Sequence, residues 1–243
     1  MQERPGGWDL EVDVVAVGSG LGSVAAAIAA HDRGSRVALL EKASRLGGVS
    51  GYGGGEVFVP NNHKMRELGI ADSDDAGRRY FAFLSAGFAD PALQKKLLDS
   101  MHPAIEYFER EAGVRWTAVE GLPDYYYPDA PGSHAGGRYL SVELFAGAGL
   151  GEWQSKTYPM TPHVPPGVLQ RELYAWVGLA NVTRWDYELM GKRLSEDLRS
   201  FGPGMMGWFL KAALVDRAIP AFVSTPVRAL VVEDGREIGR AHV

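Results

Sequence analysis

One stretch near the amino terminus, residues 12–41, constrains the fold more than any other part of this sequence. It consists of an apolar, β-branched run (12–17), a glycine turn (18–23), an alanine-rich run and a second apolar run that ends at Glu41. This order predicts a strand buried on both faces, a tight turn, a helix and a parallel second strand. The chain is therefore predicted to be an α/β protein with a Rossmann-like nucleotide-binding domain, in which helices flank a parallel sheet.

The turn itself predicts a site for the pyrophosphate of a dinucleotide. Gly18 permits the sharp turn, Gly20 lets a phosphate approach the backbone, and the small Ser23 lets the helix lie close to the sheet. The helix amino terminus offers free N–H groups and the positive end of the helix dipole. Glu41 has the spacing of an acid that binds a ribose hydroxyl. The alternative is an ordinary βαβ turn. The predicted pyrophosphate residues are Gly18, Ser19, Gly20, Gly22 and Ser23.

Composition narrows the classes of function. A net charge of -5 over 243 residues offers no basic patch, so nucleic acid is not an expected partner. The absence of cysteine excludes disulfides, thiolate metal sites and a cysteinyl flavin link. The six histidines show no paired spacing with acids, and no metal site is expected. No apolar run reaches membrane-spanning length and the amino terminus has no signal core, so a cytoplasmic location is expected.

A second glycine-rich segment follows Glu41. Residues 47–55 contain six glycines, too many for the interior of a regular helix or strand. A flexible loop is one interpretation. The position directly after the ribose-binding acid favours backbone wrapped round a bulky cofactor.

From Glu41 to Asn62 the sequence resembles the FAD-dependent fumarate reductase and 3-ketosteroid dehydrogenase flavoproteins, most closely the ketosteroid dehydrogenase branch. The shared pattern is an acid, a lysine, Gly-Gly, Tyr-x-Gly-Gly and an apolar run that ends Pro-Asn-Asn. Gly53 stands where that family has serine. The resemblance implies non-covalent FAD, bound by the turn, by the Val227 backbone at the adenine, and by Glu41, Lys42, Gly47, Gly48, Ser50, Gly53, Gly54 and Gly55.

Three adjacent tyrosines lie in a proline- and glycine-rich loop, residues 120–138. As a packing plug, the loop should bury at least one ring with its hydroxyl bonded. The family has a comparable Asp-Tyr-x-Pro segment with a tyrosine at the steroid site, followed by Gly-Arg. Alignment through Pro128 selects Tyr126 as the catalytic residue, and alignment through Asp124 selects Tyr125.

The remaining segments are predicted to be structural. Residues 72–113 have a helical, core-packing pattern with Asp90-Pro91 as cap and first turn. A short strand is expected at 114–119 and a short helix at 190–200. Residues 203–219 predict a buried helix, which leads to strands at 221–226 and 227–233 and a hairpin turn at Asp234-Gly235.

The chain is expected to be the amino-terminal part of a longer protein. Residues 1–236 are predicted to be a truncated FAD-binding domain, because the family has a substrate domain and a final flavin-binding segment further on. Residues 238–243 match one translated frame of a common sequencing adapter. We therefore expect 237–243 to be a non-native tail and the fragment to be inactive alone.

The leading hypothesis is the FAD-binding portion of an oxidoreductase that dehydrogenates a 3-ketosteroid or a similar hydrophobic ketone. The resemblance implies that a tyrosine removes a proton beside the carbonyl while hydride passes to the flavin. The electron acceptor is not indicated. The alternatives are a nicotinamide-dependent Rossmann dehydrogenase, a fumarate-type reductase fragment and a non-catalytic nucleotide-binding fragment.

Overall fold

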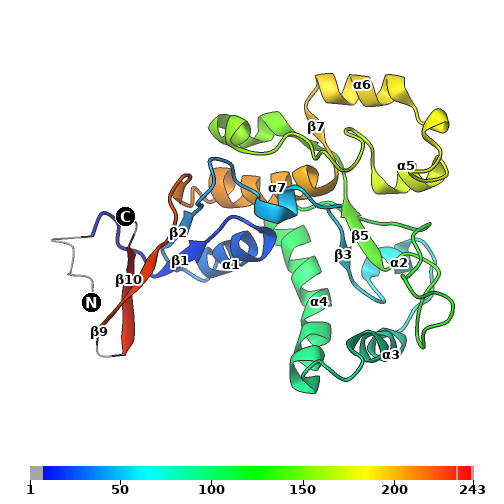
Figure 1. Ribbon diagram of the computed structural model, residues 1–243, viewed down its shortest axis with the longest axis horizontal. Coiled ribbons are helices and arrows are strands. Elements are labelled where there is room, and N and C mark those ends of the chain that lie inside the picture. Colours follow the sequence, from blue (N-terminus) through cyan, green and yellow to red (C-terminus); the bar gives the residue numbers. More distant parts are fainter. Residues whose placement is uncertain (1–7, 234, 242–243) are drawn as a thin grey trace.

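The computed structural model describes residues 8–233 and 235–241. Figure 1 shows their arrangement. The strands and helices are, in order, β1 (Val14–Val17), α1 (Leu21–His31), β2 (Val37–Leu40), β3 (Val57–Phe58), α2 (His63–Glu67), α3 (Asp74–Ser85), α4 (Pro91–Ala112), β4 (Trp116–Ala118), β5 (Tyr139–Val142), β6 (Phe145–Ala146), α5 (Gln170–Ala175), α6 (Tyr187–Ser195), β7 (Leu198–Arg199), α7 (Phe201–Leu210), β8 (Ala221–Phe222), β9 (Ala229–Glu233) and β10 (Arg236–Ala241). Short 3₁₀ helices cover Gly48–Gly51, Gly147–Lys156 and Val182–Arg184, and a π turn, Lys211–Asp216, continues α7.

The parallel sheet has the order β1-β2-β8, and both of its strand pairs are parallel. Helices α1 and α7 contact each other beside it (Figure 1). Val24 and Ile28 of α1, Leu39 of β2, and Met206 and Leu210 of α7 belong to one buried cluster. Each such side chain contributes about 1.5–3 kcal/mol by leaving water. The predicted α/β fold with a parallel sheet is confirmed, as are the buried helix after residue 200 and a strand after it, which the structure limits to Ala221–Phe222 and pairs with β2.

Strand β1 differs from the prediction at its end. It pairs only with β2 among the described strands, and Val17, its last residue, is 49% exposed. The expectation of a strand buried on both faces is therefore wrong for this end. An apolar run predicts a hydrophobic strand, but it does not predict how many other strands and helices cover that strand.

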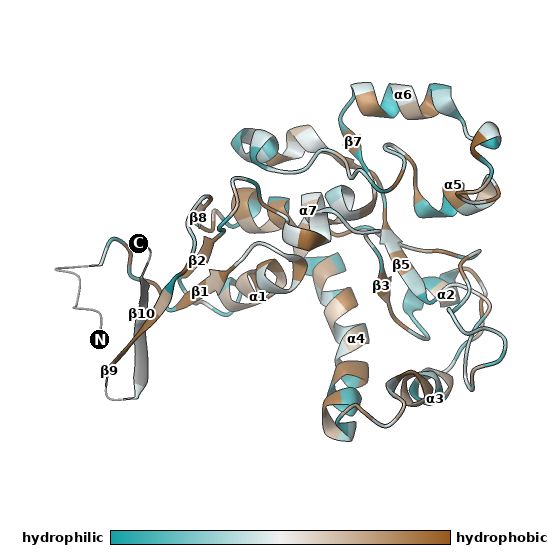
Figure 2. Cartoon of the chain, viewed as in Figure 1, coloured by the Kyte–Doolittle hydropathy of each residue, from teal (hydrophilic) through white to brown (hydrophobic). Residues whose placement is uncertain are grey.

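A second, antiparallel sheet has the order β3-β5-β4 and lies towards α2, α3 and α4. Asp90 caps α4 as predicted, since its Oδ1 accepts the N–H groups of Ala92 (2.7 Å) and Leu93 (3.2 Å). The core-packing role predicted for the whole helical region is wrong for the amino-terminal half of α4. Leu93 and Leu97 are 67% and 51% exposed there. Figure 2 shows hydrophilic and hydrophobic residues following one another along α4. The spacing of apolar residues shows that a helix has an apolar face, but it does not show which segment packs against that face.

Two small antiparallel units complete the described structure. Strands β6 and β7 pair with each other, and β7 takes up part of the region predicted as helix, because α6 begins earlier, at an Asp186 cap. Strands β9 and β10 form the expected hairpin, which projects from the left of the molecule in Figure 1. Asp234 lies outside the described residues. The predicted non-native origin of residues 237–243 stays a prediction.

Candidate functional site

Ser19 joins the turn after β1, the end of β2 and the glycine loop. Its N–H and its hydroxyl both donate to Oε2 of Glu41, at 2.8 and 2.5 Å. The same hydroxyl oxygen accepts the N–H of Gly47 at 3.0 Å. Ser19 is fully buried and Glu41 is 5% exposed. The structure thus brings together three of the segments predicted from the sequence.

The Glu41 carboxylate also contacts its own loop, because Oε1 accepts the Ala43 N–H at 2.8 Å. Burial opposes its ionisation, but the hydrogen bonds from Ala43 and Ser19 outweigh burial and lower the pKa of Glu41. A carboxylate has about four acceptor positions, so three contacts leave room for one more donor. Ribose binding by Glu41 stays a prediction. Its link to Ser19 is a structural role that sequence reasoning missed.

The first turn of α1 fits an anionic group. Gly20 is the N-cap and provides no side-chain cap, and no acid occupies the first turn. Ser50 Oγ accepts the Leu21 N–H at 3.0 Å. Gly18 has φ +86°, and neither Gly18 nor Gly22 has a neighbour within 4 Å of a Cβ position. This open space lies beside a positive helix end whose first turn carries no acid, and it matches the needs of a pyrophosphate.

The glycine loop packs against the amino terminus of α7. A Cβ on Gly55, which has φ +69°, would lie 2.1 Å from the Phe201 carbonyl carbon. A Cβ on Gly202 would lie 2.4 Å from the Ser50 oxygen, and the Gly202 N–H donates to the Gly53 oxygen at 3.1 Å. At Gly55 the glycine is thus required by close packing within the protein. Direct contact of the predicted residues Gly47, Gly48, Ser50, Gly53, Gly54 and Gly55 with a cofactor stays a prediction.

The segment after β8 runs beside Glu41. The Thr225 N–H donates to the Glu41 backbone oxygen at 2.8 Å, and the Ser224 N–H donates to the Ala43 oxygen at 2.8 Å. Val227 follows two residues later, and Lys42 is exposed. Their predicted cofactor contacts remain untested by these backbone bonds.

The tyrosine loop does not bury any of its three rings. Tyr125, Tyr126 and Tyr127 are 83%, 55% and 47% exposed, so the prediction of a buried ring is wrong. The Tyr126 ring packs edge-on against Phe83 of α3 (centroids 5.6 Å apart), and the Tyr125 ring lies 6.1 Å from that of Tyr139 in β5. The two catalytic candidates therefore face different neighbours.

Buried ionic contacts, and not buried tyrosine rings, anchor this loop. The fully buried Arg138 donates through Nε and Nη2 to Asp72 (both 2.7 Å) and through Nη1 to Asp124 (2.8 Å). Burial raises the pKa of Asp124 despite Arg138, and Asp124 Oδ1 has no hydrogen-bond partner within the described part of the chain. Sequence reasoning missed this ion pair. An acid in Asp124-Tyr125 and a base in Gly137-Arg138, at the two ends of the loop, were the signal that could have predicted it.

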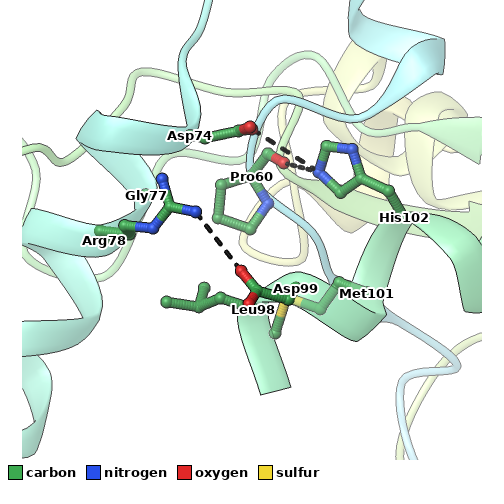
Figure 3. A pocket seen from close by; sticks show the side chains of 8 residues that line it. All are labelled: Pro60, Asp74, Gly77, Arg78, Leu98, Asp99, Met101 and His102. Carbon is green, nitrogen blue, oxygen red and sulfur yellow. Dashed lines mark hydrogen bonds and ion pairs between the residues drawn. The ribbon is translucent and has the colours of Figure 1, made fainter. Parts of the chain in front are cut away.

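A cavity of about 260 Å³ lies between α3, α4 and Pro60 (Figure 3). His102 Nε2 lies 2.8 Å from the Pro60 oxygen, and Arg78 pairs with Asp99 at 3.4 Å. None of the predicted site residues lines it. Its polar groups are engaged with each other, and we assign no function to it.

Comparison with known protein families gives a match to the FAD binding domain over residues 13–242. The chain belongs to this family. Family members and the ketosteroid dehydrogenase relatives bind FAD, as the resemblance implied. In the described part of the chain, no helix has both the length and the apolar character needed to cross a membrane.

Several relatives are ketone dehydrogenases. A 3-oxosteroid 1-dehydrogenase of Mycobacterium tuberculosis is 28% identical over 236 residues, which cover 93% of this chain and 41% of the relative. A 4-oxocyclohexanecarboxylate 2-dehydrogenase of Sinomonas cyclohexanicum is 39% identical over 132 residues, 54% of this chain and 23% of the relative. These relatives are oxidoreductases. The chain spans about two fifths of the length of the oxosteroid dehydrogenase.

Solved structures with a similar fold include a ketosteroid dehydrogenase and a fumarate reductase. The structure of 3-ketosteroid Δ1-dehydrogenase from Sterolibacterium denitrificans, in complex with 1,4-androstadiene-3,17-dione, matches with a TM-score of 0.73 and 27% identity, over 95% of this chain and 43% of that protein. A flavocytochrome c3 fumarate reductase shares the fold alone, with a TM-score of 0.59 and 16% identity over 95% of this chain and 30% of that chain. The expected family and FAD-binding fold are confirmed, and the dehydrogenase relatives belong to the expected oxidoreductase class.

Proposed function

We propose that this chain is the FAD-binding part of an oxidoreductase that dehydrogenates an uncharged, hydrophobic ketone such as a 3-oxosteroid. The observation that carries the proposal is the junction at Ser19, where the pyrophosphate turn, the ribose acid and the glycine loop meet in one buried hydrogen-bond unit. A family match over residues 13–242 supports FAD over a nicotinamide cofactor. The oxosteroid dehydrogenases among the relatives support the ketone.

In this proposal the residues of the chain divide the work between binding and proton transfer. The first turn of α1 binds the pyrophosphate, and the Glu41 carboxylate accepts a hydrogen bond from a ribose hydroxyl. The Val227 backbone contacts the adenine. Gly53 and Gly54 give the flavin ring close access to the backbone. FAD, when bound, supplies the acceptor for hydride. A tyrosine, Tyr126 or Tyr125, removes the proton beside the ketone carbonyl.

Titration of the purified chain with FAD tests the binding half of the proposal. We expect quenched or shifted flavin fluorescence, a visible spectrum that stays with the protein after gel filtration, and release of FAD on denaturation without a covalent remainder. NAD and NADP serve as controls and should not compete. Preferential binding of a nicotinamide dinucleotide would contradict the proposal.

A further inference from the structure

The glycine loop has a second neighbour besides α7, the segment of residues 156–161, which we call the covering segment. The Leu46 N–H donates to the Lys156 oxygen at 2.8 Å. The Thr161 hydroxyl donates to the Tyr52 oxygen, also at 2.8 Å. Leu46 directly precedes the N-cap of the 3₁₀ turn in the glycine loop, and Tyr52 is the C-cap of that turn. The covering segment is therefore hydrogen-bonded to the loop on both sides of the turn.

Between these two hydrogen bonds, the ring of Tyr158 lies against the glycine loop. Its Cδ2 atom is 3.1 Å from the position of a Cβ on Gly51 and 3.5 Å from that of a Cβ on Gly47. The Tyr52 ring meets the Tyr158 ring edge-on, with the centroids 4.6 Å apart. The Arg45 guanidinium lies 5.8 Å from the centroid of the Tyr158 ring, within the range of a cation–π contact. One ring thus packs on four residues of the segment 45–52.

These contacts of Tyr158 are local. In the part of the chain that the structure describes, Tyr158 belongs to neither of the two buried hydrophobic clusters. Its side chain is half-buried, and the packing partners given above all come from residues 45–52. Removal of the ring should therefore loosen the glycine loop and leave the core of the domain packed.

A buried arginine holds the backbone of the covering segment independently of the ring. Arg199 Nη1 donates to Thr157 Oγ1 at 2.7 Å and to the Tyr158 oxygen at 3.4 Å. Its Nε and Nη2 donate to the Asp197 carboxylate at 2.9 and 2.8 Å, and Arg199 is 3% exposed. The covering segment should therefore keep its place when only the Tyr158 side chain is changed.

We propose that Tyr158 is a positioning residue, which holds the glycine loop in the conformation that binds the flavin half of FAD. The inference rests on the proposed function and deepens it, because Gly53 and Gly54 of this loop are the proposed flavin contacts. A loop that already has the binding conformation does not have to be ordered when the cofactor binds, so the affinity for the cofactor is higher.

The adenosine half of FAD has different proposed partners. They are the first turn of α1, Glu41 and the Val227 backbone, and none of them is among the contacts of the Tyr158 ring given above. ADP contains this half of the cofactor and lacks the flavin. The ratio of the affinities for FAD and ADP therefore reports on the glycine loop, whereas a general loss of folded protein lowers both affinities by the same factor.

Titration of the 243-residue chain with FAD and with ADP tests the role of the ring. Tyr158→Ala should weaken FAD binding about 10-fold, if the loop then has the binding conformation about a tenth of the time. ADP binding should change by less than about twofold, because the ADP contacts are separate from the ring. Tyr158→Phe retains the ring and should retain the affinity for FAD. Tyr187→Ala, which removes an exposed tyrosine on α6, is the matched control and should bind both nucleotides normally.

A second readout needs no nucleotide. The N–H groups of Gly51 and Gly53 donate to the oxygens of Gly47 and Val49 within the loop, at 3.0 and 3.1 Å. In Tyr158→Ala these amides should exchange hydrogen for deuterium about 10-fold faster than in the wild type, while the amides of α1 exchange at unchanged rates. Circular dichroism is the folding control.

The two readouts distinguish failure of this inference from failure of the proposed function. Unchanged exchange of the loop amides in Tyr158→Ala, equal losses of FAD and ADP affinity, or weak FAD binding by Tyr158→Phe would each overturn the role of the ring. A wild-type chain that does not bind FAD would instead overturn the proposed function, and this inference with it. Faster loop exchange together with a selective loss of FAD affinity is the expected result.

Discussion

At Glu41 a single carboxylate binds the turn after β1 to the loop after β2, because it accepts hydrogen bonds from Ser19 and Ala43. Its remaining acceptor position is the one available to a ribose hydroxyl. The residue therefore combines a structural and a proposed cofactor-binding role. Its substitution should change both the stability of the free protein and the affinity for FAD.

Glu41→Ala should weaken FAD binding by about 1.5–3 kcal/mol, the contribution of a hydrogen bond to a charged group. Fluorescence titration measures the affinity, and denaturant unfolding without FAD measures the loss of the Ser19 contact. Glu106→Ala removes an exposed acid elsewhere and should bind FAD normally. Unchanged affinity in Glu41→Ala would exclude Glu41 as the ribose ligand.

The adjacent tyrosines should differ in function because their rings have different neighbours. In an active enzyme that carries this domain, Tyr→Phe at the proton-accepting position should slow turnover by about 10²–10⁴ and leave flavin content unchanged. Tyr125→Phe, Tyr126→Phe and Tyr127→Phe are to be compared side by side. Wild-type turnover in both Tyr125→Phe and Tyr126→Phe would remove the proposed catalytic role from this loop.

Glu56 should make the stability of the protein depend on pH, because burial raises the pKa of its carboxyl group. Its folded-state pKa, about 7, is above the usual 4.5, so the folded state binds more protons than the unfolded state between these values. The free energy of unfolding should therefore decrease as the pH rises through this range, on the order of 1–3 kcal/mol. Subtracting the curve of Glu56→Gln isolates this effect. Parallel curves for the two proteins would contradict it.

At the scale of elements, the glycine loop and α7 pack so closely that a single methyl group should separate them. Gly55→Ala combines a left-handed backbone with a clash against Phe201, and we expect it to lower the free energy of unfolding by about 2–5 kcal/mol. Gly53→Ala is the matched control, because its Cβ would lie 3.7 Å from its nearest neighbour. Denaturant unfolding without FAD distinguishes the two variants. Equal free energies of unfolding would show that the loop moves to accommodate the added methyl group.

At the scale of the whole molecule, Asp32 fastens three helical segments to one another. From the end of α1 its carboxylate accepts hydrogen bonds from Tyr107 of α4 (2.6 Å) and from Arg217 after the π turn (2.6 and 2.7 Å). Arg217 also donates to the backbone oxygens of Ala212 and Glu111. The hydrogen bond from Arg217 lowers the pKa of Asp32 most, against burial, and Tyr107 lowers it further.

Asp32→Asn should reduce the free energy of unfolding by about 1.5–3 kcal/mol at neutral pH. The folded-state pKa lies below the unfolded one, so this contribution is complete above the unfolded value of about 4 and is lost as the pH falls below it. The wild-type and variant curves should therefore converge in acid. Asp129→Asn, in the exposed tyrosine loop, is the control. A difference that persists unchanged at low pH would assign the effect to packing.

The sequence alone determined the parallel βαβ frame, the Asp90 helix cap, the buried helix after residue 200 and the hairpin. It also determined the family, because the glycine, acid and Pro-Asn-Asn spacings are carried by residues close together along the chain. Local backbone preferences and apolar periodicity decide such features, and a sequence displays both directly.

Only the tertiary structure decided which of these residues meet. Arg138 holds Asp72 from 66 positions away, Glu41 reaches Ser19 across 22, and Glu56 owes its raised pKa to burial. The spacing of apolar and aromatic residues also did not predict that the three tyrosines and the first half of α4 are exposed. The physical reason is that burial, hydrogen-bond partners and the local dielectric depend on contacts between distant segments, whereas spacing along the chain records only what each segment prefers by itself.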